Sequence, residues 1–227
     1  MRKTGEELEK IKKKLGVDTL YSYSRLDCWR TSKYEYMLRY VKHEKPLAEK
    51  KSAYAWLGGI AHDIIESAYK GEIEQREMKY KFHQGWTEAI DLIGIKFNRN
   101  DPDKNRKLEE AYNENMKAFF TFYQMLPYKV KTELFLLTKI SNNIYVQGYA
   151  DAIFQDADGN VVVCDWKTSR KYTKKEMRSH SHQLAIYCEA LRQKGVPAER
   201  IKACFCFLKY AKVKFTQKNG KVVESIS

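Results

Sequence analysis

The spacing of apolar residues along the chain changes once, near residue 130. Before that point apolar residues recur every three or four positions, as on the buried face of a helix. After it, short runs alternate or are continuously apolar, as in strands. The pattern predicts a helical part over about 1–130 and a sheet with one further helix over about 131–227. No internal repeat or low-complexity linker separates the parts, so we expect one domain over 1–227.

The helical half begins with two amphipathic segments. A surface helix is predicted over 1–17, where leucine and isoleucine recur at helical spacing among lysines and glutamates. A second helix is predicted from Ser24, because Ser24 and Asp27 resemble a capping box whose side chains satisfy free backbone amides. A polar connection at 45–46 ends this segment. Its apolar stripe, which we expect to pack in the core, comprises Tyr34, Met37, Leu38 and Val41.

Helical spacing resumes over 53–69, where two glycines permit close packing. His62 and Glu66 lie four residues apart in this segment and therefore share one helix face. The helical pattern continues over 72–126, with a polar, proline-containing break at 98–104. The apolar stripe of the first of these helices comprises Trp56, Ile60, Ile64, Ile65 and Ala68.

The second half reads as strands joined by turns, with one helix over 173–194 that ends before a glycine and a proline. Turns are predicted at 141–143, at 218–220 and at 156–160, where Asp and Gly tolerate positive φ. The predicted strands are 133–140, 144–154, 161–166, 201–210 and 213–224. The first three form a meander with a buried last member, and a helix between two buried strands indicates a crossover. The predicted fold class is α/β, of the α+β kind, with a mixed central sheet flanked by helices.

Composition and charge add a partner to this picture. Apolar residues make up 43% of the 227 residues and charged residues 31%, which favours a folded protein. Lys and Arg outnumber Asp and Glu by 42 to 29, a formal charge of +13, and such an excess attracts polyanions such as DNA. Solubility alone, or a basic membrane-surface protein, would give the same balance. We find no long apolar span, signal-peptide core or lipidation motif, so no membrane partner is expected.

Five cysteines stand at positions 28, 164, 188, 204 and 206. Their number is odd and no CxxC pair occurs, so neither a disulfide framework nor a zinc site is indicated. A reducing, cytoplasmic setting fits this pattern.

The residues that carry chemistry are Asp151, Asp165 and Lys167. Side chains alternate along a strand, so Asp165 and Lys167 are predicted to project from the same face. Asp151 and Asp165 each lie seven residues from Asp158, the centre of the predicted hairpin turn, so antiparallel pairing brings them close. Two adjacent carboxylates repel unless a cation joins them, and Mg²⁺ prefers such oxygen ligands. The alternative is an ordinary surface ion pair at a strand end, which Asp-x-Lys alone commonly forms.

Four segments together resemble the PD-(D/E)XK nucleases. They are GYAD at 148–151, VVVCDWKTS at 161–169, HQLAIY at 182–187 and GGIAHDIIE at 58–66. In their order they resemble the GxxD, (D/E)xKT, QxxxY and upstream histidine motifs of the RecB-like group. That group includes nuclease domains of bacterial recombination helicases, CRISPR-associated adaptation nucleases and many phage exonucleases. The opening segment at 21–41 also resembles the start of these domains, so the resemblance covers most of the chain.

The resemblance implies a restriction-endonuclease-like core and a role for each motif residue. Asp151, Asp165 and His62 would bind Mg²⁺ or Mn²⁺, and the carbonyl of Trp166 would complete the shell. Lys167 would be the catalytic lysine.

The remaining motif positions have weaker assignments. Gln183 and Tyr187 would approach the active site or the DNA backbone, although simple helix packing with exposed polar tips is the alternative. Glu66 would orient His62. Glu133 resembles an acidic position that precedes GxxD in some members.

A basic stretch follows the candidate active-site strand and is a candidate path for DNA. A solvated charged face is the alternative. The stretch comprises Arg170, Lys171, Tyr172, Lys174, Lys175 and Arg178.

Some relatives carry an iron–sulfur cluster bound by one N-terminal and three C-terminal cysteines. Cys28 matches the first of these places, but it is followed by Trp29 where a proline is common. Cys204 and Cys206 lie in a strand-like segment and Cys188 lies in a predicted helix, a spacing unsuited to a cluster. We therefore expect no iron–sulfur cluster.

These observations predict a Mg²⁺- or Mn²⁺-dependent deoxyribonuclease, an exonuclease that processes DNA ends in recombination, repair or phage replication. The alternatives are a structure-specific or other endonuclease on the same fold, and a non-catalytic DNA-binding module. DNA is the expected partner, and a recombinase, a single-strand-binding protein and further copies of the chain are candidate partners. The expected location is the cytoplasm of a bacterium or a phage-infected cell.

Overall fold

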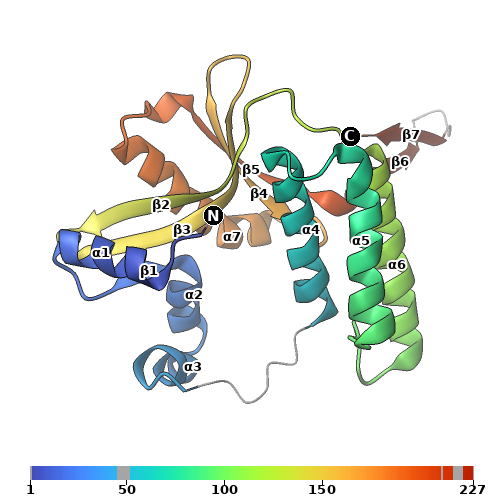
Figure 1. Ribbon diagram of the computed structural model, residues 1–227, viewed down its shortest axis with the longest axis horizontal. Coiled ribbons are helices and arrows are strands. Elements are labelled where there is room, and N and C mark those ends of the chain that lie inside the picture. Colours follow the sequence, from blue (N-terminus) through green and yellow to red (C-terminus); the bar gives the residue numbers. More distant parts are fainter. Residues whose placement is uncertain (1, 45–51, 211, 217–221, 227) are drawn as a thin grey trace. The chain divides into compact units, whose positions relative to one another are not determined.

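The computed structural model describes residues 2–44, 52–210, 212–216 and 222–226 (Figure 1). The chain divides into two compact units, each assembled from separated segments. The sheet unit comprises Met1–Lys50, Tyr128–Asp165 and Thr173–Cys204. The helical unit comprises Lys51–Pro127, Trp166–Tyr172 and Phe205–Ser227. The expectation of a single domain stays a prediction.

The main sheet has five strands, and β3 is its central member. β3 pairs with β2 antiparallel along nearly its whole length, and the two form a long hairpin (Figure 1). Along its other edge, β3 pairs with β1 in parallel through Tyr145–Gln147 and with β4 antiparallel through Ala152–Gln155, which makes the sheet mixed. The strands are β1 (Leu20–Ser22), β2 (Lys131–Ser141), β3 (Ile144–Gln155), β4 (Val161–Lys167) and β5 (Ile201–Phe207).

The predicted meander is confirmed by the pairing of β2, β3 and β4. Five successive residues of its last strand, β4, are buried, from Val162 through Trp166. The turn before β4 is fixed by Asp156, whose Oδ1 accepts hydrogen bonds from the backbone amides of Asp158 and Asn160 at 3.0 and 2.9 Å.

Helix α7 (Lys174–Gln193) connects β4 to β5, which are neighbours in the sheet, so the predicted helix between these two strands is confirmed. Its N-terminus is capped by Thr173, which exchanges hydrogen bonds with Glu176 in a capping box. On β2 the Thr138 hydroxyl donates to the carbonyl of Ile186 at 2.8 Å, which ties the helix to the sheet.

The prediction that β5 is buried is wrong. Lys202, Ala203 and Cys204 in its middle are exposed. β5 ends the strand order, and an edge strand has no neighbour on one side to cover it.

The N-terminal segment of the sheet unit differs from its prediction in two ways. β1 was not expected, since three residues are too few to show a period. Ser22, and not Ser24, caps the next helix, because Ser22 has extended backbone and its hydroxyl accepts a hydrogen bond from the amide of Arg25 at 3.1 Å. The helices are α1 (Gly5–Leu15), α2 (Tyr23–Thr31), α3 (Lys33–Tyr36) and a π-helical turn (Met37–Val41).

The predicted core stripe of this segment is wrong for two of its residues. Tyr34 is 69% exposed and Val41 is 61% exposed. The stripe crosses from α3 into the π-helical turn at Met37, so its residues do not keep the 3.6-residue period of one helix face.

The helical unit is built on three helices that lie side by side (Figure 1). Asp101 caps the third helix and Pro102 occupies its first turn, which confirms the predicted break before it. Buried side chains of the unit include Leu57, Ile65, Phe82, Trp86 and Tyr112. The helices are α4 (Ala53–Lys70), α5 (Met78–Trp86) and α6 (Pro102–Phe122), with short turns at Gln75–Glu77 and Thr87–Leu92.

The last strands do not join the main sheet. Among the described residues, β6 (Lys212–Thr216) and β7 (Val222–Ile226) pair with each other in a separate antiparallel sheet, where further strands of one sheet were predicted. The predicted connection at 45–46 and turn at 218–220 lie outside the described residues. Within the described part of the chain, no helix is long and apolar enough to cross a membrane.

The mixed α/β class is confirmed, as is the helical character of the first half. The five-strand mixed sheet, with α7 joining β4 to β5, is consistent with the restriction-endonuclease-like core that the motifs imply.

Candidate functional site

Asp151 and Asp165 face each other across two strands of the sheet unit. β3 and β4 pair in a register that sets Ala152 opposite Cys164. The same register, carried one residue further, sets Asp151 opposite Asp165. Asp165 is 4% exposed, so its carboxylate lies where charge is costly without a counter-charge. The hairpin predicted around Asp158 therefore places the two carboxylates as expected.

A third carboxylate extends this row onto β2. The pairs Thr132–Ala152 and Leu134–Ala150 bracket Glu133 and set it opposite Asp151. Glu133 departs from strand geometry with a φ of 47°, and its Oε2 accepts a hydrogen bond from Nε of Arg2 at 2.6 Å. The ion pair with Arg2 partly neutralises the negative charge of Glu133.

Gln183 and Tyr187 of α7 act as a pair in the same unit. Nε2 of Gln183 donates to the Tyr187 hydroxyl at 2.9 Å, and Tyr187 is 4% exposed. The ring lies directly over Gly148, where an added Cβ would come within 2.6 Å of the Tyr187 oxygen and of one ring carbon. The glycine of the GYAD segment is therefore needed so that Tyr187 can pack against β3.

The three carboxylates of Asp151, Asp165 and Glu133 also affect the pKa of Tyr187. Burial raises the pKa of the Tyr187 hydroxyl, the hydrogen bond from Gln183 lowers it, and the charges of Asp151, Asp165 and Glu133 raise it further. The hydroxyl keeps its proton at neutral pH, so it can donate a hydrogen bond to an anionic oxygen. Helix packing with an exposed polar tip, the alternative for Tyr187, does not fit its burial.

The helical unit carries the remaining motif residues around a cavity of about 700 Å³. Its lining is rich in cationic and hydroxyl groups, and no carboxylate is among the described residues that line it. The lining includes His62, Lys167, Thr168, Arg170, Tyr172 and Lys209. A cavity of this size and charge suits an anionic ligand.

Trp166, which lines this cavity, packs against two aromatic rings of α4. It is 5% exposed, its ring stacks on Tyr69 with centroids 6.3 Å apart, and it meets the His62 ring edge-on at 5.8 Å. These contacts hold the His62 ring against the end of β4. Glu66, proposed to orient His62, forms an ion pair with Lys70, in which Oε1 of Glu66 lies 2.5 Å from the Lys70 ammonium.

Thr168, next to Lys167, is held by close packing against α4. A Cβ added at Gly58 would lie 3.0 Å from the Thr168 hydroxyl oxygen, whereas one added at Gly59 would meet nothing within 4 Å. Gly58 of the GGIAH segment thus allows the chain after β4 to approach the helix that carries His62.

Lys209 was not predicted from the sequence. Its ammonium lies 5.5 and 5.0 Å from the ring centroids of Tyr54 and Tyr112, and burial lowers its pKa. In sequence only its position after the apolar run of β5 marks it, and many surface lysines share that position.

The predicted DNA stretch is divided between the units. Arg170 and Lys171 are exposed in the helical unit, where the Tyr172 ring packs against Phe205 and Phe207 at 5.4 and 5.1 Å. In the sheet unit the exposed basic residues of the first turns of α7 are Lys174, Lys175 and Arg178. Exposure is compatible both with a DNA path and with a solvated face.

The carboxylate pair fits a divalent cation of the Mg²⁺ or Mn²⁺ kind. In the ranges that the structure describes, no group of three or more His, Cys, Asp or Glu side chains is arranged to hold a metal ion. Asp151 and Asp165 would therefore bind a cation that keeps several water ligands, as Mg²⁺ does.

Comparison with known proteins adds to this geometry. The family model described as the PD-(D/E)XK nuclease superfamily matches residues 20–226. No curated protein matches the sequence.

Proposed function

Because the chain belongs to the PD-(D/E)XK nuclease superfamily, we propose that it is a divalent-metal-dependent deoxyribonuclease that degrades DNA from its ends. Family membership supports hydrolysis of phosphodiester bonds with the help of Mg²⁺ or Mn²⁺. The exonuclease mode rests on the resemblance of its motifs to those of the RecB-like group. The same resemblance supports a role in recombination, repair or phage replication, in the cytoplasm of a bacterium or an infected cell. The proposed partners are a recombinase, a single-strand-binding protein or further copies of the chain.

The facing pair of Asp151 and Asp165 is the observation that carries the proposal. The register of β3 and β4 brings the two carboxylates together, and the Asp165 carboxylate is buried. Two neighbouring negative charges, one of them buried, favour a bound cation. When bound, a divalent ion supplies charge for the phosphodiester oxygens and an activated water. Asp151 and Asp165 hold the ion, and the protonated Tyr187 hydroxyl is placed to donate a hydrogen bond near the same carboxylates.

Lys167 and His62 enter the proposal from their motifs and from the cavity that both line. Lys167 would hold the scissile phosphate or orient the attacking water. His62 would be a further ligand of the ion, and the carbonyl of Trp166 would complete its shell. The cavity lining supports phosphate binding at Lys167, because Arg170 and Lys209 add positive charge there.

Calorimetric titration with Mn²⁺ tests the carboxylate pair without relying on activity. We expect the wild-type protein to bind Mn²⁺, and Asp151→Asn and Asp165→Asn each to lose most of that binding. Asp158→Asn removes an exposed carboxylate from the turn of the same hairpin and should bind as the wild type does. Equal Mn²⁺ binding by all four proteins would refute the assignment.

The exonuclease mode is tested by the shape of the DNA. The protein should degrade linear duplex in Mg²⁺ or Mn²⁺, remain inactive in EDTA, and spare closed circular duplex and single-stranded circles. Cleavage of either circle would reject the exonuclease mode and favour an endonuclease. Binding of all these substrates without cleavage of any would favour a non-catalytic module.

A further inference from the structure

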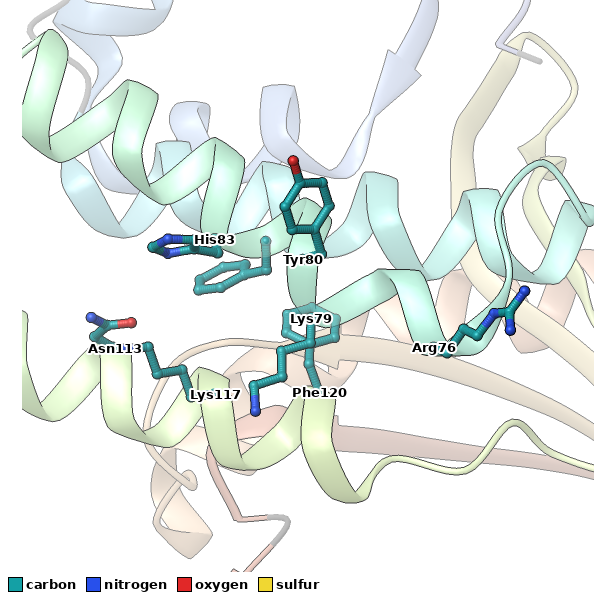
Figure 2. A pocket seen from close by; sticks show the side chains of 8 residues that line it. Arg76, Lys79, Tyr80, His83, Asn113, Lys117 and Phe120 are labelled. Atoms are coloured by element: carbon teal, nitrogen blue, oxygen red, sulfur yellow. The ribbon is translucent and has the colours of Figure 1, made fainter.

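A second cavity of the helical unit, of about 430 Å³, opens between α5 and α6 (Figure 2). It shares no lining residue with the cavity around His62 and Lys167. Its volume is near the lower end of the range for small-ligand sites, about 300–1,000 Å³. None of the sequence motifs accounts for it.

Helical periodicity gathers the lining residues on two facing stripes. On α6, Asn113, Lys117 and Phe120 recur at spacings of four and three and therefore share one face. On α5, Lys79 and His83 are separated by four residues and share the face that meets them. Figure 2 shows these side chains along the two helices.

The cavity combines an apolar floor with an exposed aromatic ring. Phe82 and Phe120 are 2% and 6% exposed, and their ring centroids lie 5.1 Å apart. Tyr80 also lines the cavity but is 61% exposed. A ring with this much open face can stack on a flat ligand.

The charge of the lining is positive. Arg76, Lys79 and Lys117 line the cavity, and none of its described lining residues is Asp or Glu. The helix α5 itself contains no Asp or Glu. Arg76 lies 2.6 Å from Glu74. Among the described residues, Lys79 and Lys117 make no ion pair, so an anion at the cavity would be their first partner of opposite charge.

We propose that this cavity is a second DNA contact, which binds a nucleotide of single-stranded DNA outside the candidate active site. Lys79 and Lys117 contact its phosphates, Tyr80 stacks on a base, and the amide of Asn113 meets the base edge. The inference rests on the proposed DNA nuclease function and adds the strand state that the protein holds. An acidic peptide also suits basic residues over an apolar floor, but the exposed stacking ring and the amide favour a nucleotide.

The salt dependence of binding tests the two lysines. Binding of a fluorescent oligo-dT is measured by anisotropy in EDTA, where metal-dependent cleavage does not occur. For Lys79→Gln/Lys117→Gln, the slope of log K against log salt should become shallower by about 1.4, at about 0.7 per phosphate contact. The control Lys104→Gln/Lys107→Gln removes two exposed charges from other faces of α6 and should keep the wild-type slope. An equal change of the salt slope in the two double variants, or an unchanged slope in both, overturns the proposal.

Tyr80 provides a second readout that charge does not affect. Tyr80→Leu should weaken oligo-dT binding about fivefold or more, since a lost base stack costs about 1–3 kcal/mol. Tyr80→Phe keeps the ring and should bind like the wild type, and neither change should alter the salt slope. Equal binding by Tyr80→Leu and Tyr80→Phe contradicts the stacking role.

Two further measurements separate the other outcomes. If the lysine pair keeps the wild-type slope but loses affinity for an aspartate-rich peptide ending in phenylalanine, the cavity is a peptide site and the proposal is overturned. Cleavage of linear DNA is measured in parallel. If the wild type cleaves DNA and the lysine pair keeps the wild-type slope, the proposed DNA contact at the cavity is overturned and the nuclease function is not. If the lysine pair shows the expected slope change but the wild type cleaves no DNA, the nuclease function is overturned and the DNA contact at the cavity is supported.

Discussion

Among single residues, Gly148 and Tyr187 show how a motif position acquires its identity from a distant contact. The facing of Asp151 and Asp165 could be predicted, because a hairpin centred on Asp158 fixes their register from local sequence alone. The packing of Tyr187 over Gly148 could not, because it joins α7 to β3 through tertiary structure. Lys209 was missed for the same reason, since its aromatic neighbours lie on α4 and α6.

Gly148→Ala should lower the free energy of unfolding by about 1–3 kcal/mol, because its Cβ overpacks against a buried ring. It should also reduce DNA cleavage by displacing the Tyr187 hydroxyl. Urea denaturation of a double-mutant cycle checks the cause. In a Tyr187→Ala background, Gly148→Ala should cost much less, and an equal cost in both backgrounds would show that Tyr187 is not the obstacle.

Tyr112 makes the stability of the protein sensitive to alkaline pH. Burial raises its pKa to about 12 in the folded state, so folding favours the protonated phenol. Its contribution should be complete below the unfolded pKa, about 10, and be lost as pH rises to about 12, a loss of about 2–3 kcal/mol. Urea denaturation at several pH values should show a smaller alkaline loss in Tyr112→Phe than in the wild type. Parallel curves for the two proteins would count against this account.

Lys209→Gln should raise KM for DNA more than it lowers kcat, because the half-buried ammonium lines the candidate phosphate cavity. Steady-state cleavage of a linear duplex measures both constants. Lys194→Gln, an exposed lysine after α7, should leave both unchanged. A fall in kcat alone for Lys209→Gln would assign the lysine to the chemical step instead.

At the scale of helices and strands, long periodic segments were predictable and their ends were not. The helices α4, α6 and α7 follow from apolar spacing and capping signals over many residues. The start of α2 was misplaced because Ser22 and Ser24 both resemble caps, and the choice depends on the strand β1 that ends at Ser22. The exposure of β5 depends on its place at the edge of the sheet, which no local pattern records.

Helix α4 offers a matched test of packing at adjacent glycines. Gly59→Ala fills open space and should stabilise the protein by up to about 1 kcal/mol through helix propensity. Gly58→Ala has the same propensity gain but meets the Thr168 hydroxyl at 3.0 Å, so it should be less stable than Gly59→Ala and impair cleavage more. Thermal unfolding and cleavage assays compare the two variants. Identical behaviour would mean that Thr168 yields without consequence.

For the whole molecule, the order of four motifs along one chain was more informative than any single motif. Asp-x-Lys alone describes many surface ion pairs, but the match to the nuclease superfamily extends over residues 20–226. What sequence could not provide is the division into two compact units, since each is assembled from three separate segments. The carboxylates Asp151 and Asp165 belong to one unit, and the cavity lined by His62 and Lys167 belongs to the other.

The most direct test is metal-dependent cleavage of an end-labelled linear duplex by the wild type, Asp165→Asn and Asp158→Asn. We predict that the wild type and Asp158→Asn cleave in Mg²⁺ or Mn²⁺, and that Asp165→Asn shows no more cleavage than the EDTA control while still binding the duplex. Metal-dependent cleavage by purified Asp165→Asn at the wild-type rate would contradict the account.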